Sequence, residues 1–146
     1  MKEKTSQADR PLMRDCHCFN LRRAALAVTA LYDRHVEAAG VTIQQFCVLR
    51  HVRDWGPVSV TELSERIGLD RTTLSRNLAL LERRGLLAVQ PPPGRQRPMV
   101  LTADGKKTIK RALLCWQKAQ KEIEDRLGAG QMERLEELLN GLLTEK

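Results

Sequence analysis

The side chains best suited to thiol or metal chemistry in this chain of 146 residues are its four cysteines. Cys16 and Cys18 are two positions apart, which is about 200° around a helix, so a formed helix cannot direct both sulfurs at one metal ion. Their spacing also differs from the Cys-x-x-Cys pattern of zinc sites. Cys47 and Cys115 lie among apolar neighbours, which predicts buried, inert thiols. We predict no metal site and no cofactor.

The three histidines, His17, His35 and His51, give no catalytic signal, because no acidic residue lies at a spacing that would pair with one of them. Cys18 could be the nucleophile of a thiol peroxidase. Turnover would also require an accessible resolving thiol, and the sequence specifies none. We therefore predict that the chain is not an enzyme.

A second group of side chains has the chemistry of nucleic-acid recognition. Hydroxyl and guanidinium groups bind base edges and phosphates in the major groove of DNA. Such groups cluster near the start of a predicted helix and point away from its leucine stripe, Leu74, Leu78 and Leu81. The residues are Arg71, Thr72, Ser75 and Arg76. This arrangement is typical of a recognition helix.

The elements around that helix form a helix-turn-helix pattern. Ser59 and Glu62 have the spacing of a capping box, which begins a short helix that Gly68 ends. Asp70 is placed to cap the next helix, and Gly85 to end it. Two short helices joined by a tight turn that contains glycine are the signature of this motif.

A hairpin follows the second helix. Residues 86–90 and 99–102 are compatible with β-strands, and the proline-rich segment 91–98 joins them. The segment contains Arg95 and Arg97. Arginines at the tip of a stiff hairpin suit the narrow minor groove of DNA, where the negative potential is strongest. The hairpin is therefore predicted to be the wing of a winged helix-turn-helix.

Charge and composition support a polyanion as the partner. The net charge is +7, and residues 61–111 hold 11 basic against 5 acidic residues, which accounts for six of the seven charges. A concentrated excess of this kind favours nucleic acid. A winged module that binds protein or RNA without reading sequence is the other class of binding protein considered; its affinity would depend on salt alone.

No apolar run is long enough to span a bilayer, and the first residues do not resemble a signal peptide. The 42% apolar and 29% charged residues are typical of a soluble domain. Free cysteines without a signal peptide favour a reducing compartment. We expect a cytoplasmic protein with no membrane partner.

Long helices flank the winged part. Residues 1–11 are predicted to be a flexible arm, followed by a single domain over 12–146. Within it, residues 12–39 and 103–146 are predicted dimerisation helices, and 42–102 the DNA-binding part. The fold class is mainly α. The leucine-rich terminal helices have too little partner surface in one chain, so we expect a two-fold homodimer. Such a dimer would bind a pseudo-palindromic operator, with its recognition helices about 34–36 Å apart.

The order of these elements resembles the MarR family of dimeric winged-helix transcription regulators. The most specific segments are TLSRNLALLERRGLLAV and GRQRPMVLTADGKK. The resemblance places Arg71, Thr72, Ser75 and Arg76 at the major-groove positions of the family, and Arg95 at its wing arginine. Pro93 stands where the family usually has an aspartate that braces this arginine. Either proline stiffness replaces the ion pair, or Arg97 enters the groove instead.

The segment CFNLRRAALAVTALYDRHVEAAGVTIQQF resembles the members of the family that sense organic hydroperoxides, with a reactive Cys18 before Phe19. The resemblance implies a repressor whose Cys18 is held by tyrosines of the partner subunit. Tyr32 matches one of these tyrosines, whereas Ile43 replaces the other. Fourteen helical residues span about 21 Å, so Cys18 and Tyr32 of one chain cannot touch. A small-molecule effector, or a soft metal or metalloid bound through Cys16 and Cys18, are the alternative inputs.

Overall fold

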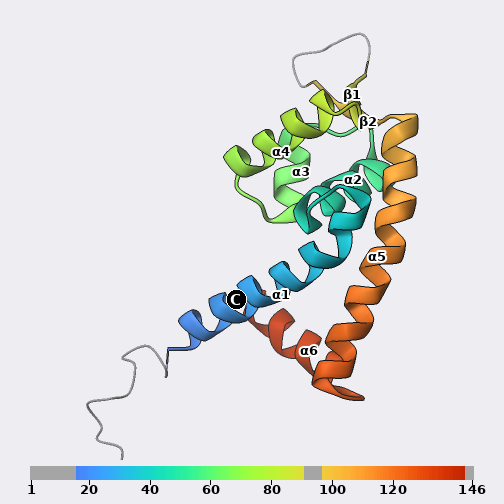
Figure 1. The fold of residues 1–146 in the computed structure, drawn as a ribbon. Helices are drawn as coiled ribbons and strands as arrows, with labels where there is room; N and C mark the ends of the chain where they lie inside the picture. The colour runs from blue at the N-terminus through green and yellow to red at the C-terminus, as the bar shows by residue number, and fades with distance from the viewer. Residues whose placement is uncertain (1–15, 91–96, 144–146) are drawn as a thin grey trace, which may run out of the picture.

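The computed structural model describes residues 16–90 and 97–143. The predictions for the arm over 1–11, for Pro93 and for Arg95 lie outside these ranges. The helical elements are α1 (His17–Val36), the 3₁₀ turn η2 (Glu37–Ala39), α2 (Ile43–Trp55), α3 (Val60–Ile67), α4 (Arg71–Arg83), α5 (Ala103–Leu127) and α6 (Gln131–Leu143), and the strands are β1 (Leu87–Val89) and β2 (Met99–Leu101). The predicted fold class, mainly α with a winged helix-turn-helix between long terminal helices, is confirmed (Figure 1).

The two helices of the helix-turn-helix, α3 and α4, begin and end where their capping residues predict. The Ser59 hydroxyl accepts from the Glu62 amide, and the Glu62 carboxylate accepts from the Ser59 amide, so the capping box of α3 is complete. Gly85 follows α4 with φ +70, a conformation that costs glycine little. Its amide donates to the carbonyl of Glu82 while the Leu86 amide donates to that of Leu81, which is the Schellman arrangement.

The wing has a short antiparallel sheet at its base. β1 pairs with β2 in the register Leu87↔Leu101, Ala88↔Val100 and Val89↔Met99. An isolated bridge joins Val58, just before α3, to Met99. The sheet is therefore attached to the helix-turn-helix on one side and leads directly into α5 on the other (Figure 1).

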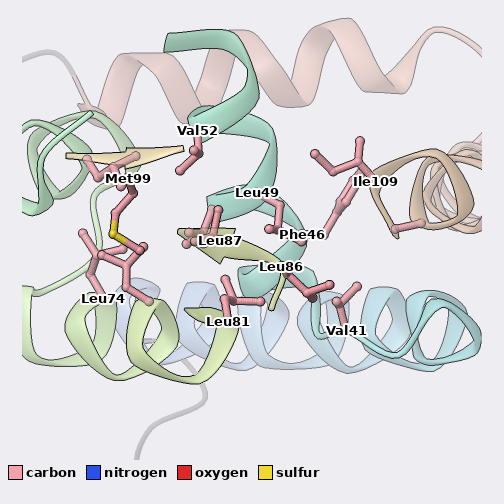
Figure 2. Close-up of a cluster of buried hydrophobic side chains, with 14 of the residues drawn as sticks. Val41, Phe46, Leu49, Val52, Leu74, Leu81, Leu86, Leu87, Met99 and Ile109 are labelled. Carbon is pink, nitrogen blue, oxygen red and sulfur yellow. The ribbon is translucent and has the colours of Figure 1, made fainter. Parts of the chain in front are cut away.

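The hydrophobic core lies between α2, α4, the sheet and the first half of α5 (Figure 2). Phe46 and Leu49 of α2 are fully buried, as are Leu74 and Leu81 of α4, and Ile109 extends the cluster onto α5. Burial of one such side chain contributes about 1.5–3 kcal/mol. The leucine stripe that holds α4 in the core leaves its opposite face free for another partner.

The first helix differs from its prediction. A helix is expected over 12–39, but Cys16 is the N-cap of α1, and the α-helix ends at Val36 before the η2 turn. Gly40, with φ +75, then reverses the chain direction. Much of the apolar surface of α1 is uncovered within one chain, because Leu21 and Val28 are exposed and Leu31 and Val36 alone are buried on this helix.

Two polar contacts fasten the end of α1 to α5. The Tyr32 hydroxyl donates to Oε1 of Gln120. His35 Nε2 lies 2.7 Å from a carboxylate oxygen of Glu122. No acid at a pairing distance in the sequence was predicted for His35, and its acidic partner comes from a different helix instead. The two residues are 87 positions apart, and only the packing of α1 against α5 brings them together, so local spacing gave no signal.

None of the helices among the described residues is long and apolar enough to cross a membrane.

Candidate nucleic-acid interface

The exposed face of α4 gathers the four residues predicted to lie in the major groove. Arg71, Thr72, Ser75 and Arg76 are all exposed, and together with Ala79 they line one shallow hollow of about 440 Å³. Leu74, Leu78 and Leu81 are buried on the opposite side. The cluster is cationic and rich in hydroxyl groups, so it can donate hydrogen bonds to phosphates and to acceptors on base edges.

The first of the two arginines is held by the neighbouring helix. The Arg71 guanidinium donates to the Thr61 hydroxyl at the start of α3, 3.2 Å away. For Arg76, no protein partner is seen within the described part of the chain. Arg71 is therefore oriented in advance, whereas Arg76 keeps its donors available.

The start of α4 is fixed by Asp70. Its carboxylate accepts a hydrogen bond of 2.9 Å from the Thr73 amide. Hydrogen bonds from Thr73 hold the pKa of Asp70 below its ordinary value. The cap stays ionised at neutral pH, and it interacts favourably with the positive end of the helix. It fixes the turn of helix that carries Arg71 and Thr72.

The wing contributes one described arginine. Arg97 adopts φ +44, which is uncommon for a residue with a side chain. Its guanidinium lies 3.4 Å from a carboxylate oxygen of Glu82 on α4. Glu82 could not be predicted as its partner, because it is 15 positions away in the sequence and has no spacing signal. Arg95 lies outside the described residues, so the structure does not choose between the two wing arginines.

The cysteines occupy different environments. Cys18 is exposed in the first turn of α1, and Cys16, its N-cap, is half-buried. Cys47 and Cys115 are half-buried rather than fully buried. Burial raises the pKa of the Cys47 thiol, which agrees with the inert role predicted for it. All four are free.

Tyr32 lies 14 positions beyond Cys18 on the same helix. Burial, and then the nearby Glu124 carboxylate, raise the pKa of its hydroxyl. That hydroxyl donates to Gln120 of the same chain. Over residues 16–90 and 97–143, no group of three or more His, Cys, Asp or Glu side chains is arranged to hold a metal ion.

A separate hollow of about 510 Å³ lies at the corner where α1 leads into α2. Its lining is mixed polar and apolar, and it consists of Asp33, Arg34, Glu37, Gly40, Val41, Thr42 and Gln45. The Asp33 carboxylate accepts from the Ile43 amide at 2.7 Å, so part of this polar lining is already engaged in capping α2.

Comparison with known proteins supports the same assignment. A model described as the MarR family matches residues 39–98, which run from the last residue of η2 to the residue before β2. The chain is 31% identical to the transcriptional regulator MosR of M. tuberculosis, over 90% of this chain and 96% of that one, with a TM-score of 0.77. The chain belongs to the MarR family.

Two further similar proteins agree. The structure of the same M. tuberculosis regulator in complex with DNA matches with 32% identity and a TM-score of 0.73, over 88% of this chain and 96% of that one. The HTH-type transcriptional repressor NicR of Pseudomonas putida is 28% identical over 113 residues, which are 76% of this chain and 72% of the relative. Membership of the MarR family makes the protein a DNA-binding transcription regulator and not an enzyme.

Proposed function

We propose that the protein is a homodimeric repressor that binds a pseudo-palindromic operator through α4 and the wing and leaves it when an effector acts. The observation that carries this proposal is the exposed face of α4, where Arg71, Thr72, Ser75 and Arg76 lie together opposite a buried leucine stripe. A second support is the related regulator whose structure is described as a complex with DNA. We propose repression rather than activation because the relative NicR is described as a repressor.

The uncovered apolar surface supports the homodimer. None of the α6 residues, Gln131–Leu143, is buried in the single chain, and Leu142 is 66% exposed. On α1, Leu26 is 70% exposed. Such surfaces are unfavourable in water, and a two-fold partner would cover them. In this proposal α1, α5 and α6 form the dimer, and residues 42–102 bind DNA.

For the effector, we propose oxidation of Cys18, which is exposed where α1 begins. Its thiolate would attack an organic hydroperoxide, so that the O–O bond breaks, the alcohol leaves and Cys18 becomes a sulfenic acid. The Cys16 thiol would then attack that sulfur, releasing water and forming a disulfide. Cys16 is the extended N-cap of α1 and Cys18 lies in its first turn, so forming the disulfide would rearrange the start of this helix.

A small ligand is the second candidate effector, because the hollow at the α1–α2 corner is large enough to admit one. It lies between a proposed dimerisation helix and the start of the DNA-binding part. A ligand there could change the angle between the two parts and so the distance between the two recognition helices. A soft metal or metalloid bound through Cys16 and Cys18 is the third candidate effector. Among the described residues it would have only these two sulfur ligands.

The test is a fluorescence-anisotropy titration of the protein against its own upstream intergenic DNA at fixed salt. We expect tight binding by the reduced protein, loss of binding after one equivalent of an organic hydroperoxide, and recovery with a thiol reductant. Cys18→Ser should bind DNA and ignore the oxidant, whereas Cys115→Ser should behave as the wild type does. Equal binding before and after oxidation would reject the redox input and leave operator binding in place.

A further inference from the structure

A second basic surface lies away from α4's exposed face, where the end of α4 meets the start of α5. It is a hollow of about 520 Å³ lined by Arg84, Leu86, Asp104, Lys107, Thr108, Lys110 and Arg111. We call it the basic hollow. In the sequence these cations belong to the central basic region, and no local pattern separates them from the DNA-binding group.

The charges of the basic hollow are unbalanced. Four cations line it, and its single carboxylate, Asp104, is already 3.3 Å from the Lys107 ammonium. Leu86 and Thr108 are buried and form an uncharged floor. Like charges held around one small space repel each other, and an anion with several negative oxygens would relieve that repulsion. A singly charged anion would leave most of the excess uncompensated.

The hollow does not lie on the face of α4 that is proposed to contact DNA. The four exposed residues over 71–76 are centred on one side of the helix, and Arg84 is rotated by about 150° from that direction. Arg84 donates a hydrogen bond of 2.6 Å to the Gly40 carbonyl, at the corner between α1 and α2. The Arg84 side of the hollow therefore lies away from the exposed face of α4 and next to the α1–α2 corner.

The frame around the hollow is rigid. The Thr102 hydroxyl donates to the Gly85 carbonyl at 2.6 Å and accepts from the Gly105 amide at 3.0 Å. A Cβ at Gly105 would lie 2.1 Å from the Leu86 carbonyl oxygen, so only glycine allows α5 to approach this closely. The backbone that carries the α5 cations is thus fixed relative to the backbone of residues 85 and 86, next to Arg84.

We propose that the basic hollow binds a small, multiply charged anion, one that carries several phosphate or carboxylate oxygens. Arg84 links this site to the rest of the molecule, since it lines the hollow and its guanidinium also donates to the Gly40 carbonyl. An anion that draws Arg84 toward itself weakens the bond to Gly40. Because Arg84 is the C-cap of α4, occupancy of the hollow then changes how the recognition helix is fastened to the α1–α2 corner.

The first test measures anion binding without DNA. Isothermal titration calorimetry of pyrophosphate into the full chain at constant ionic strength should give saturable binding of one pyrophosphate per chain. Lys110→Ala and Arg111→Ala should each weaken it at least fivefold, whereas Lys121→Ala, an exposed lysine further along α5, should not. Citrate in a parallel titration separates a phosphate site from a polycarboxylate site. Absence of saturable binding of both anions, or equal weakening by Lys121→Ala, would overturn the proposal.

The second test measures the link through Arg84, and it rests on the proposed operator binding. At constant ionic strength, pyrophosphate should change the operator affinity of the wild type at least threefold. It should leave that of Arg84→Ala unchanged, and Arg84→Lys separates loss of charge from loss of the guanidinium geometry. Pyrophosphate that binds in the calorimeter but changes no affinity would remove the link. If Lys110→Ala weakens DNA binding without any anion as much as Arg76→Ala does, the hollow is a phosphate-backbone contact and the anion site is wrong.

Discussion

The two arginines at the start of α4 differ in their hydrogen bonds to the rest of the protein. Arg71 is tied to Thr61, whereas the Arg76 donors are not engaged by any described residue. A guanidinium without a protein partner loses fewer internal bonds when it binds a base edge or a phosphate. The Arg76 side chain therefore has the most to contribute to the operator complex.

We predict that Arg76→Ala weakens operator binding by about 1–3 kcal/mol, which is the usual contribution of one specific arginine contact. Lys121→Ala is the matched control, because it also removes one exposed cation but lies on α5. The measurement is fluorescence anisotropy at several salt concentrations, so that loss of a phosphate contact appears as a smaller salt slope. Equal affinities of Arg76→Ala and Lys121→Ala would remove α4 from the interface.

A second prediction at this scale concerns the contact between His35 and Glu122. The hydrogen bond from His35 holds the pKa of Glu122 below its ordinary value of 4.5. The ionised carboxylate therefore stabilises the fold above about pH 4.5, and that stabilisation is lost as the pH falls through the lowered pKa. Glu122→Gln should have a lower Tm than the wild type at neutral pH, and the difference should close below pH 4.5.

The control for this pH dependence is Glu65→Gln, an exposed substitution on α3. It should show no comparable closing of the Tm difference over the same range. A Glu122→Gln protein that parallels the wild type from neutral to acidic pH would mean that the contact between α1 and α5 does not depend on this carboxylate. Protein concentration must be constant throughout, because a dimer's Tm depends on it.

At the scale of elements, the joint between α4, the wing and α5 depends on one glycine. Gly105→Ala should destabilise the protein by about 1–3 kcal/mol, because the new methyl group has no space against the Leu86 carbonyl and forces the helix away. The measurement is urea denaturation at fixed protein concentration. Lys106→Ala, a substitution at the exposed neighbour, should leave the free energy of unfolding unchanged within about 0.5 kcal/mol. A neutral Gly105→Ala would show that α5 does not pack this closely.

Most elements follow from local signals that the sequence carries. The Ser59–Glu62 box, Asp70 and Gly85 mark the bounds of α3 and α4 because capping bonds join neighbouring residues. The same holds for α5, which begins after Thr102 as predicted. Contacts between distant residues were not predictable in this way. The partners of His35 and Arg97 are 87 and 15 positions away, and packing alone selects them.

The end of α1 shows the same limit. The predicted helix runs to residue 39, but the α-helix ends at Val36 and continues as the 3₁₀ turn η2, and no helix-ending residue precedes Gly40 to mark this change. The four residues of the proposed DNA site were predictable as a group because helical spacing alone places them on one face. The basic hollow was not, because its lining comes from α5 and from the segment between α4 and β1, which are distant in the sequence.

At the scale of the whole molecule, the apolar surface of α1 and α6 decides whether the protein works as one chain or two. A monomer would present one recognition helix and gain half of the contacts that a two-fold operator offers. The proposed dimer joins both helices to one rigid frame, so that the second half-site is bound at a high effective concentration. Operator affinity should therefore depend on residues far from α4.

We predict that Leu142→Glu converts the protein to a monomer and lowers its affinity for the intact operator by at least tenfold, although the residue is on α6 and contacts no DNA in this proposal. A charge at the centre of an apolar interface is costly to bury, whereas the same charge in water is not. The control is Glu137→Lys, which changes an exposed side chain on the opposite face of α6. Sedimentation-velocity ultracentrifugation gives the oligomeric state, and anisotropy gives the affinity for the intact operator and for a single half-site. If dimerisation supplies the affinity, Leu142→Glu binds both DNAs equally weakly; a monomeric variant with full operator affinity would instead place all of the binding energy in one winged unit.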